Sequence, residues 1–371
     1  MSTLLAPAPP VLRPQPWRTA LLAALTVWAT TTAARLAVSL LGHRSSALHG
    51  WNQWDAQHYV TIAEHGYHEG PGYPAFFPLH PLLIRLLDPV LPGGGQVAAL
   101  VIANAAGIGA LAVLHRLAAH EFGPLVARRA AWYLAATPMG FFLFIGYNES
   151  LFVLLAAGAL YAGRRGHWWL AGALAGMSSA TRLFGLLLIV PLAVEYLRAH
   201  RIRPDVLGLA LVPSGALAYS LYCWMELGDP LAFSVAQDQW DRRYTLPGEA
   251  WLIAVRQIGE PGALGAILDA GSVLLAAVLL VLCVTGPWRF RRDQAYLVVQ
   301  GALTLVVLMS TEVGGRSMQS AARYAMEAVA IFLVLARIGA NEAADRAVLM
   351  VGMALQAAFL VVFMGGTFLV A

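Results

Sequence analysis

Eleven apolar segments, separated mostly by short polar turns, dominate the sequence. They cover residues 18–41, 96–118, 130–146, 148–163, 167–180, 183–197, 206–226, 263–285, 295–310, 323–339 and 347–370. A helix needs about 20 apolar residues to cross a hydrocarbon core of about 30 Å, so the shorter segments require tilt, local thinning of the bilayer or burial among neighbours. With 59% hydrophobic and 12% charged residues, the chain lies outside the range of soluble proteins. We therefore predict an all-α polytopic membrane protein with about 11 transmembrane helices.

The positions of the arginines indicate how these segments are oriented. All 24 basic residues are arginine, and this composition, rich in Ala, Gly, Leu and Val, is typical of a GC-rich bacterial genome. Residues 75–91 are apolar but contain three prolines, Arg85 and Asp88, so we expect a helix that enters the membrane without crossing it. With a cytoplasmic N-terminus, 15 of the 24 arginines then lie on the cytoplasmic side, as the positive-inside rule requires. We predict a bacterial plasma-membrane protein with an extracytoplasmic C-terminus.

No boundary between separate domains is visible. Residues 1–17 form a Pro-rich tail that lacks a cleavable signal pattern, and we expect this tail in the cytoplasm. Residues 18–371 are expected to form a single integral-membrane domain. Two long outer loops are expected within it: residues 42–91, which include the partly inserted helix, and residues 227–262.

The same orientation places unusual polar residues together on the outer face. The polar stretch 51–81 carries Asp55, Glu64, several histidines and many aromatic residues. The other outer turns contribute Asn148, Glu149, Arg182, Gln237, Trp240, Arg316, Arg323 and Tyr324. Taken singly, each arginine is explained as an interfacial anchor and each polar residue before a span as a helix cap. Their convergence on one face beside Asp55 instead favours a functional site, because ionisable groups at membrane depth are costly.

These residue types suit the transfer of a sugar from a lipid phosphate. A guanidinium pairs bidentately with phosphate, and a carboxylate such as Asp55 can accept a proton from an attacking hydroxyl. The aromatic faces of Trp54, Tyr59 and Trp240 suit the apolar side of a sugar ring. On one short helix, Asp55, His58 and Tyr59 would share a face. The histidines offer zinc or manganese ligands as an alternative, but their spacing matches no strong motif, so we expect no metal and no cofactor.

Other classes of protein also have many apolar spans. A transporter or flippase of a lipid-linked or anionic solute would place its charges near the bilayer midplane, in positions related by an internal repeat. This sequence concentrates its charges at one face and shows no such repeat. A scaffold for cell-wall assembly would explain the spans but not the clustered polar residues. The basic loops are explained by membrane orientation and lack the aromatic-interleaved pattern of nucleic-acid binding, so no nucleic-acid partner is expected.

Several short stretches resemble a known family of membrane enzymes. The first-loop sequence WNQWDAQHYVTIAEHGY, followed by AFFPLHPLL, is similar to the signature of the PIG-V family, the GPI second mannosyltransferases and their bacterial relatives. The stretches NESLF, ATRLFG and GDPLAF, and a late RY before a span, also resemble this family and occur in the expected order. The resemblance implies a GT-C glycosyltransferase fold, a polyprenyl-phosphate-mannose donor and an inverting mechanism. It also implies that Asp55, the acidic residue of the first outer loop, is the catalytic base.

The expected site therefore has one catalytic residue, Asp55, and a larger set of substrate-binding residues. The donor phosphate is expected near Arg323, Arg182 or Arg316. The acceptor is an unidentified lipid or glycan on the extracytoplasmic face. The substrate-binding set is Trp54, His58, Tyr59, Glu64, Asn148, Glu149, Arg182, Gln237, Trp240, Arg316, Arg323 and Tyr324.

Overall fold

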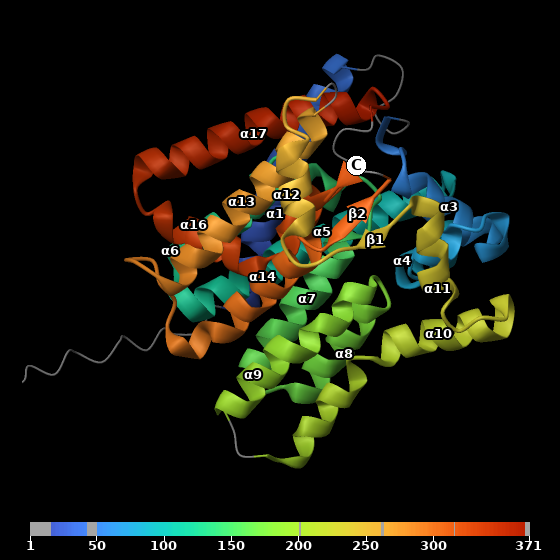
Figure 1. Ribbon diagram of the computed structural model, residues 1–371. Helices are drawn as coiled ribbons and strands as arrows, with labels where there is room; N and C mark the ends of the chain where they lie inside the picture. The colour runs from blue at the N-terminus through green and yellow to red at the C-terminus, as the bar shows by residue number, and fades with distance from the viewer. Residues whose placement is uncertain (1–15, 43–49, 200–201, 261–262, 315, 368–371) are drawn as a thin grey trace, which may run out of the picture.

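The computed structural model describes residues 16–42, 50–199, 202–260, 263–314 and 316–367, which form a bundle of helices (Figure 1). Residues 1–15 of the expected tail and 43–49 of the expected first outer loop lie outside the described part of the chain. The α-helices are α1 (Trp17–Gly42), α3 (Asp55–His65), α4 (Leu79–Leu87), α5 (Gly94–Phe122), α6 (Pro124–Ala136), α7 (Glu149–Arg164), α8 (Trp168–Ser179), α9 (Ile189–Ala199), α10 (Ser214–Leu227), α11 (Ala232–Val235), α12 (Glu249–Arg256), α13 (Leu264–Val284), α14 (Ala295–Leu308), α15 (Ala321–Tyr324), α16 (Val329–Ile338) and α17 (Glu342–Met364).

Shorter elements connect these helices. The 3₁₀ turns are η1 (Tyr67–Glu69), η2 (Tyr73–Ala75), η3 (Asp88–Val90), η4 (Gly140–Leu143), η5 (Leu183–Leu188), η6 (Pro204–Leu211), η7 (Ala236–Trp240), η8 (Arg292–Gln294) and η9 (Ala325–Glu327). Three short strands are also present: β1 (Arg243–Tyr244), β2 (Thr311–Val313) and β3 (Arg316–Ser317).

The helical membrane fold is confirmed, and each of the predicted spans coincides with helical structure. Within the described residues, four helices are long and apolar enough to cross a membrane, namely α1, α5, α13 and α17. The pair formed by η6 and α10, bent by 43°, makes a fifth if it is counted as one span. The other predicted spans are shorter helices or are divided into pieces, so helix length does not by itself support eleven crossings.

Proline and a buried glutamine account for three of these divisions. Helix α6 ends just before Pro138, and Pro213 lies at the bend between η6 and α10, since proline removes a backbone donor and disfavours helix before it. The predicted span 323–339 is interrupted at Ala328, between η9 and α16. There Gln300 donates to the carbonyl of Glu327 at 2.9 Å and accepts from Val329 N at 3.1 Å. The side chain of Gln300 thereby satisfies backbone groups that the broken helix leaves free.

Close backbone packing holds the end of α8, which precedes the predicted site residue Arg182. A Cβ at Gly172 would lie 1.8 Å from the carbonyl oxygen of Gly208, so the contact between α8 and η6 requires glycine. Ser179, the last residue of α8, donates to the carbonyl of Val212 at 2.9 Å and fastens the same two elements. Because α8 is held in this way, the residues that follow it, including Arg182, begin from a fixed position.

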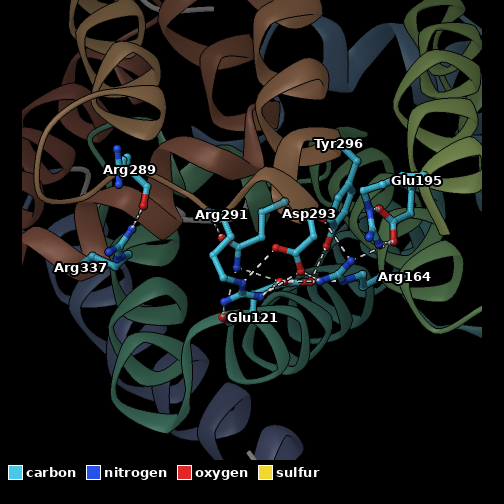
Figure 2. A network of polar contacts seen from close by, with 10 residues as sticks. Glu121, Arg164, Glu195, Arg289, Arg291, Asp293, Tyr296 and Arg337 are labelled. Carbon is cyan, nitrogen blue, oxygen red and sulfur yellow. Dashed lines mark hydrogen bonds and ion pairs between the residues drawn. The ribbon is translucent and has the colours of Figure 1, made fainter. Parts of the chain in front are cut away.

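Helix α7 joins two clusters of buried charge. Its first residue, Glu149, belongs to the candidate site described below, and its last residue, Arg164, belongs to the cluster in Figure 2. Nitrogens of Arg164 lie 2.6 Å from Glu121, 2.9 Å from Glu195 and 2.6 Å from Asp293. The cluster ties the C-terminal ends of α5 and α7 to α9 and η8. Since α7 has 16 residues, the two clusters are about 24 Å apart along its axis.

The three strands connect two loops that are predicted to lie on the outer face. Strand β1, from the 227–262 loop, pairs antiparallel with β2, and β2 pairs antiparallel with β3. The register places Arg243 opposite Glu312. This small sheet brings the segment after α10 and the segment after α14 to the same place.

Candidate active site

A cavity of about 200 Å³ lies where the first outer loop meets the ends of several helices. Helix α3, the segments before α7 and after α8, turn η7, strand β1 and helix α15 all contribute side chains to it. The lining combines one carboxylate, three arginines and many aromatic rings. Its principal residues are Trp54, Asp55, His58, Tyr59, Phe76, Phe77, Asn148, Arg182, Phe233, Gln237, Trp240, Arg242, Tyr244, Arg323 and Tyr324.

Helix α3 positions the carboxylate. It begins at Asp55, and Asp55, His58 and Tyr59 all line the cavity because residues three and four apart lie on one face of a helix. Trp54, which precedes the helix, has φ 54° and ψ −121°, a backbone conformation that is costly for a large side chain. Ser320, another residue of the lining, has φ 65°. Backbone strain of this kind is often found at functional sites.

Arg323 is buried and contacts Asp55 directly. Its side chain is 2% exposed, and its Nη1 donates to Oδ2 of Asp55 at 2.8 Å. Its Nε lies 3.2 Å from Oε1 of Glu149, and its Nη2 donates to the hydroxyl of Tyr324 at 2.6 Å. The catalytic-base candidate and a phosphate-binding candidate therefore form one ion pair.

Arg182 extends this ion pair into a chain of alternating charges. Its Nε donates to Oδ1 of Asn148 at 2.9 Å, and its Nη1 lies 2.7 Å from Oε1 of Glu327. Its Nη2 contacts Glu149, which consequently bridges Arg182 and Arg323. Asn148 and Glu149 thus hold the two guanidinium groups in place in addition to starting α7.

Within this series of ion pairs, carboxylates outnumber guanidinium groups. Among the described residues, the three carboxylates of Asp55, Glu149 and Glu327 form ion pairs with two guanidinium groups, those of Arg182 and Arg323. Buried ion pairs are held in place by such contacts, and removing one partner leaves an uncompensated charge. An anion that enters the cavity must therefore compete with a carboxylate for either arginine.

Arg242 is a third guanidinium in the cavity and differs from the other two. It is half-buried, and within the described residues it makes no ion pair. Its Nε is buried and has no hydrogen-bond partner in that part of the chain. Its neighbour Arg243 is exposed and pairs with Asp241 at 3.1 Å. Arg242 is therefore a cation available to an anionic ligand.

Aromatic rings form the wall on which His58 packs. The ring of His58 lies 5.2 Å from Phe76 and 5.4 Å from Trp240, measured between centroids. Burial lowers the pKa of His58 and outweighs the opposing attraction of Asp55, so the imidazole is neutral at pH 7. Trp240 donates its Nε1 hydrogen to the carbonyl of Gly72 at 3.1 Å and so joins the second outer loop to the first.

Ten of the predicted site residues line the cavity, and Glu149 and Glu64 do not. Glu149 lies behind the lining, fully buried between the two arginines. Glu64 lies away from the cavity: its side chain is 44% exposed and is 3.7 Å from His65. Nine residues separate it from Asp55, which is about half a turn out of phase on a helix of 3.6 residues per turn. Arg316 lies in β3 rather than next to a span.

Sequence reasoning did not single out Glu327 and Arg242. Glu327 lies inside the predicted span 323–339, and an acidic residue at membrane depth is a recognisable signal for a buried partner, which is Arg182. Arg242 stands next to Arg243, and nothing in the sequence distinguishes the two. Among the residues that the structure describes, no group of three or more His, Cys, Asp or Glu side chains is arranged to hold a metal ion.

Comparison of sequences identifies relatives over part of the chain. Residues 31–202 match the family model described as Mannosyltransferase (PIG-V). The GPI alpha-1,6-mannosyltransferase 2 of Cricetulus griseus is 33% identical over 213 residues, which is 55% of this chain and 42% of that protein. The GPI mannosyltransferase 2 of Yarrowia lipolytica is 32% identical over 118 residues, 32% of this chain and 33% of that protein. The chain thus matches less than half the length of these relatives.

Comparison of structures concerns the fold. The oligosaccharyltransferase of Archaeoglobus fulgidus, in its apo form, superposes with a TM-score of 0.52 at 13% identity and covers 93% of this chain and 56% of that chain. That protein has the GT-C fold. Residues 31–202 of the chain described here are thus similar to the PIG-V mannosyltransferases, and the chain has a GT-C fold.

Proposed function

We propose that this protein is a mannosyltransferase that takes mannose from a polyprenyl-phosphate donor and gives it to a lipid or glycan acceptor. The acceptor lies on the extracytoplasmic face of a bacterial plasma membrane. The observation that carries the proposal is the position of Asp55, in a cavity that also holds Arg182, Arg242 and Arg323. The family match and the names of the relatives support the choice of mannose as the sugar.

The proposed reaction is a single displacement. Asp55 accepts the proton of an acceptor hydroxyl while that oxygen attacks the anomeric carbon of mannose. The bond between the anomeric carbon and the phosphate oxygen breaks, and the phosphate leaves with the electron pair. Because attack comes from the face opposite the phosphate, a β-linked donor gives an α-mannoside. The rings of Trp54, Tyr59 and Trp240 line the space in which the sugar would lie.

The ion pair between Asp55 and Arg323 suggests how donor binding activates the base. Without donor, the guanidinium of Arg323 is engaged by Asp55 and Glu149. A donor phosphate that contacts Arg323 would draw its Nη1 away from Oδ2 of Asp55, which would leave that oxygen free to accept the proton of the acceptor hydroxyl.

Arg242 is proposed as the first contact of the donor phosphate. Arg182 and Arg323 are engaged by carboxylates, whereas Arg242 makes no ion pair within the described residues and lines the same cavity. Capture of phosphate by Arg242 costs no existing ion pair. The phosphate then competes with Asp55 for Arg323, and charge develops on its oxygens between two guanidinium groups as the bond to mannose breaks.

The test is to supply the purified protein with synthetic polyprenyl-phosphate β-mannose and membranes from cells that lack the chain. The proposal expects a mannosylated product with an α linkage, determined from the one-bond coupling between C1 and H1 in its NMR spectrum. It also expects Asp55→Asn to form product about 10²–10⁴ times more slowly. A β-linked product would contradict the single displacement, and transfer that requires a nucleotide-linked sugar instead of the lipid donor would contradict the donor.

A further inference from the structure

A second cavity, of about 360 Å³, lies outside the candidate active site. It is formed by the C-terminal half of α3, by α4, by the end of α8 and by α10. Helices α3, α4 and α10 lie at the same side of the bundle in Figure 1. Its lining is mainly apolar and includes Ile62, Leu79, Ala180 and Ala218. A volume of this size lies in the range of small-molecule sites.

The second cavity is a groove that opens where the surface of the protein is apolar. On α4, Leu82 and Leu86 are 49% and 63% exposed, and on α10, Leu217 and Leu221 are 63% and 51% exposed. A surface of this kind on a membrane protein faces lipid chains rather than water. Hydrocarbon from the bilayer therefore has direct access to the groove.

Arg85 adds a positive charge to this apolar opening. It lines the groove from α4, is exposed, and makes no ion pair or hydrogen bond within the described residues. A guanidinium beside an apolar groove is complementary to a molecule with a hydrocarbon chain and an anionic head.

An aromatic wall separates the groove from the candidate active site. Tyr219, which lines the groove, donates its hydroxyl to the carbonyl of Pro74 at 2.7 Å and lies 5.0 Å from the ring of Phe77. Phe77 in turn lines the first cavity. A molecule in the groove thus supports the wall of the active site from behind and does not occupy the space beside Asp55.

We propose that the groove binds one anionic phospholipid, with an acyl chain between α4 and α10 and the phosphate at Arg85. The donor of the proposed reaction is not this occupant, because its phosphate must reach the cavity on the other side of the wall. The phospholipid would instead hold α3 and α4 against α10. The proposal does not depend on the transfer reaction, since it concerns binding alone.

The test measures lipid binding to the purified protein by native mass spectrometry. Phosphatidylglycerol and phosphatidylcholine are titrated separately onto wild type, Arg85→Ala, Ala218→Phe and a control, Arg256→Ala, which removes an exposed arginine of α12. Arg85→Ala should weaken one saturable phosphatidylglycerol site about tenfold and leave phosphatidylcholine unchanged. Ala218→Phe, which fills the groove, should abolish that site although Arg85 is intact.

Folding of the variants is checked separately from lipid binding. The elution volume and the melting temperature of each variant in lipid-free detergent should match those of wild type, because all three substituted side chains are exposed. If all four proteins bind phosphatidylglycerol equally, or if Arg256→Ala weakens binding as much as Arg85→Ala does, the groove is not a specific site and the proposal is wrong.

Discussion

Nη1 of Arg323 donates to Oδ2 of Asp55 at 2.8 Å, although 268 positions separate the two residues in the chain. The contact joins the first outer loop to the start of a late helical segment. The two proposed roles compete. While Nη1 of Arg323 donates to Oδ2 of Asp55, that nitrogen cannot bind phosphate and that oxygen is less available to accept a proton. This competition underlies the expected behaviour of both residues.

Asp55→Asn should keep the fold and remove the base. The amide has the same shape and can still accept a hydrogen bond from Arg323. We expect the turnover rate to fall by about 10²–10⁴, the usual range for general acid–base catalysis, with donor binding largely retained. The measurement is initial rate at saturating donor, together with donor binding by filtration. Glu64→Gln on the exposed face of α3 is the matched control and should stay near wild type; loss of activity there instead would move the base to Glu64.

Arg323→Lys should separate charge from geometry. Lysine keeps the positive charge but loses the planar fork that reaches Asp55, Glu149 and a phosphate together. A charge-assisted contact at this depth contributes about 1.5–3 kcal/mol, so catalytic efficiency should fall about tenfold to a hundredfold. Arg323→Ala should lose at least as much. Activity is measured per mole of folded protein, and a lysine variant with wild-type donor dependence would end the phosphate role of Arg323.

Arg242→Ala should weaken donor use selectively. Because Arg242 lines the cavity without an ion pair in the described structure, its removal leaves no buried carboxylate unpaired. The KM for donor should rise about tenfold, whereas the melting temperature should not change. Arg243→Ala is a closely matched control, since it removes the adjacent, exposed arginine. Equal effects of the two substitutions on KM would show a general electrostatic influence and would refute a specific contact.

Arg164→Met should destabilise the protein from the opposite end of α7. Its side chain is 9% exposed and its guanidinium contacts three carboxylates, which would be left with insufficient positive charge. Loss of one partner from a buried ion pair typically costs about 3–5 kcal/mol. The expected result is a lower melting temperature in detergent, with donor KM unchanged in the folded fraction. Arg165→Met, at an exposed neighbouring position, should melt as wild type does.

The pKa of His58 predicts how stability depends on pH. Burial lowers this pKa below its ordinary value of 6.5, so below that pH the unfolded chain binds a proton that the folded chain does not. Stability contributed by neutral His58 is therefore present above pH 6.5 and is lost as pH falls toward the folded pKa. Denaturant unfolding of wild type and His58→Gln at several pH values measures this. Parallel pH dependences for the two proteins would contradict the assignment.

The sequence was informative about which residues meet but not about how they pair. Motifs and the positive-inside rule placed Asp55, Arg182 and Arg323 at one face, and the structure brings all three to one cavity. The ion pair between Asp55 and Arg323 was not predictable, because it depends on how helices far apart in the chain pack. Glu64 belongs to the same motif as Asp55, but the helical phase directs it elsewhere.

Local backbone conformation explains why Arg242 and Arg243 differ in the structure although the sequence does not distinguish them. Asp241 has φ 46°, a left-handed conformation, directly before Arg242. The chain turns there, and of the adjacent arginines Arg242 lines the cavity whereas Arg243 lies in the exposed strand β1. Sequence alone treats the two as equivalent. The breaks within predicted spans could not be predicted from local sequence either. The contacts that stabilise the break at Ala328 come from Gln300, which lies on another helix.

The most direct test of the central claim uses sealed vesicles that contain the purified protein and radiolabelled polyprenyl-phosphate mannose, with membrane extract as the source of acceptor. A mannosyltransferase that depends on Asp55 should move the label into a new product that survives mild acid, and Asp55→Asn should not. No net movement of label across the vesicle should accompany the reaction. Movement of intact donor across the membrane without a new product, equal in wild type and Asp55→Asn, would contradict the account and indicate a transporter of lipid-linked sugar.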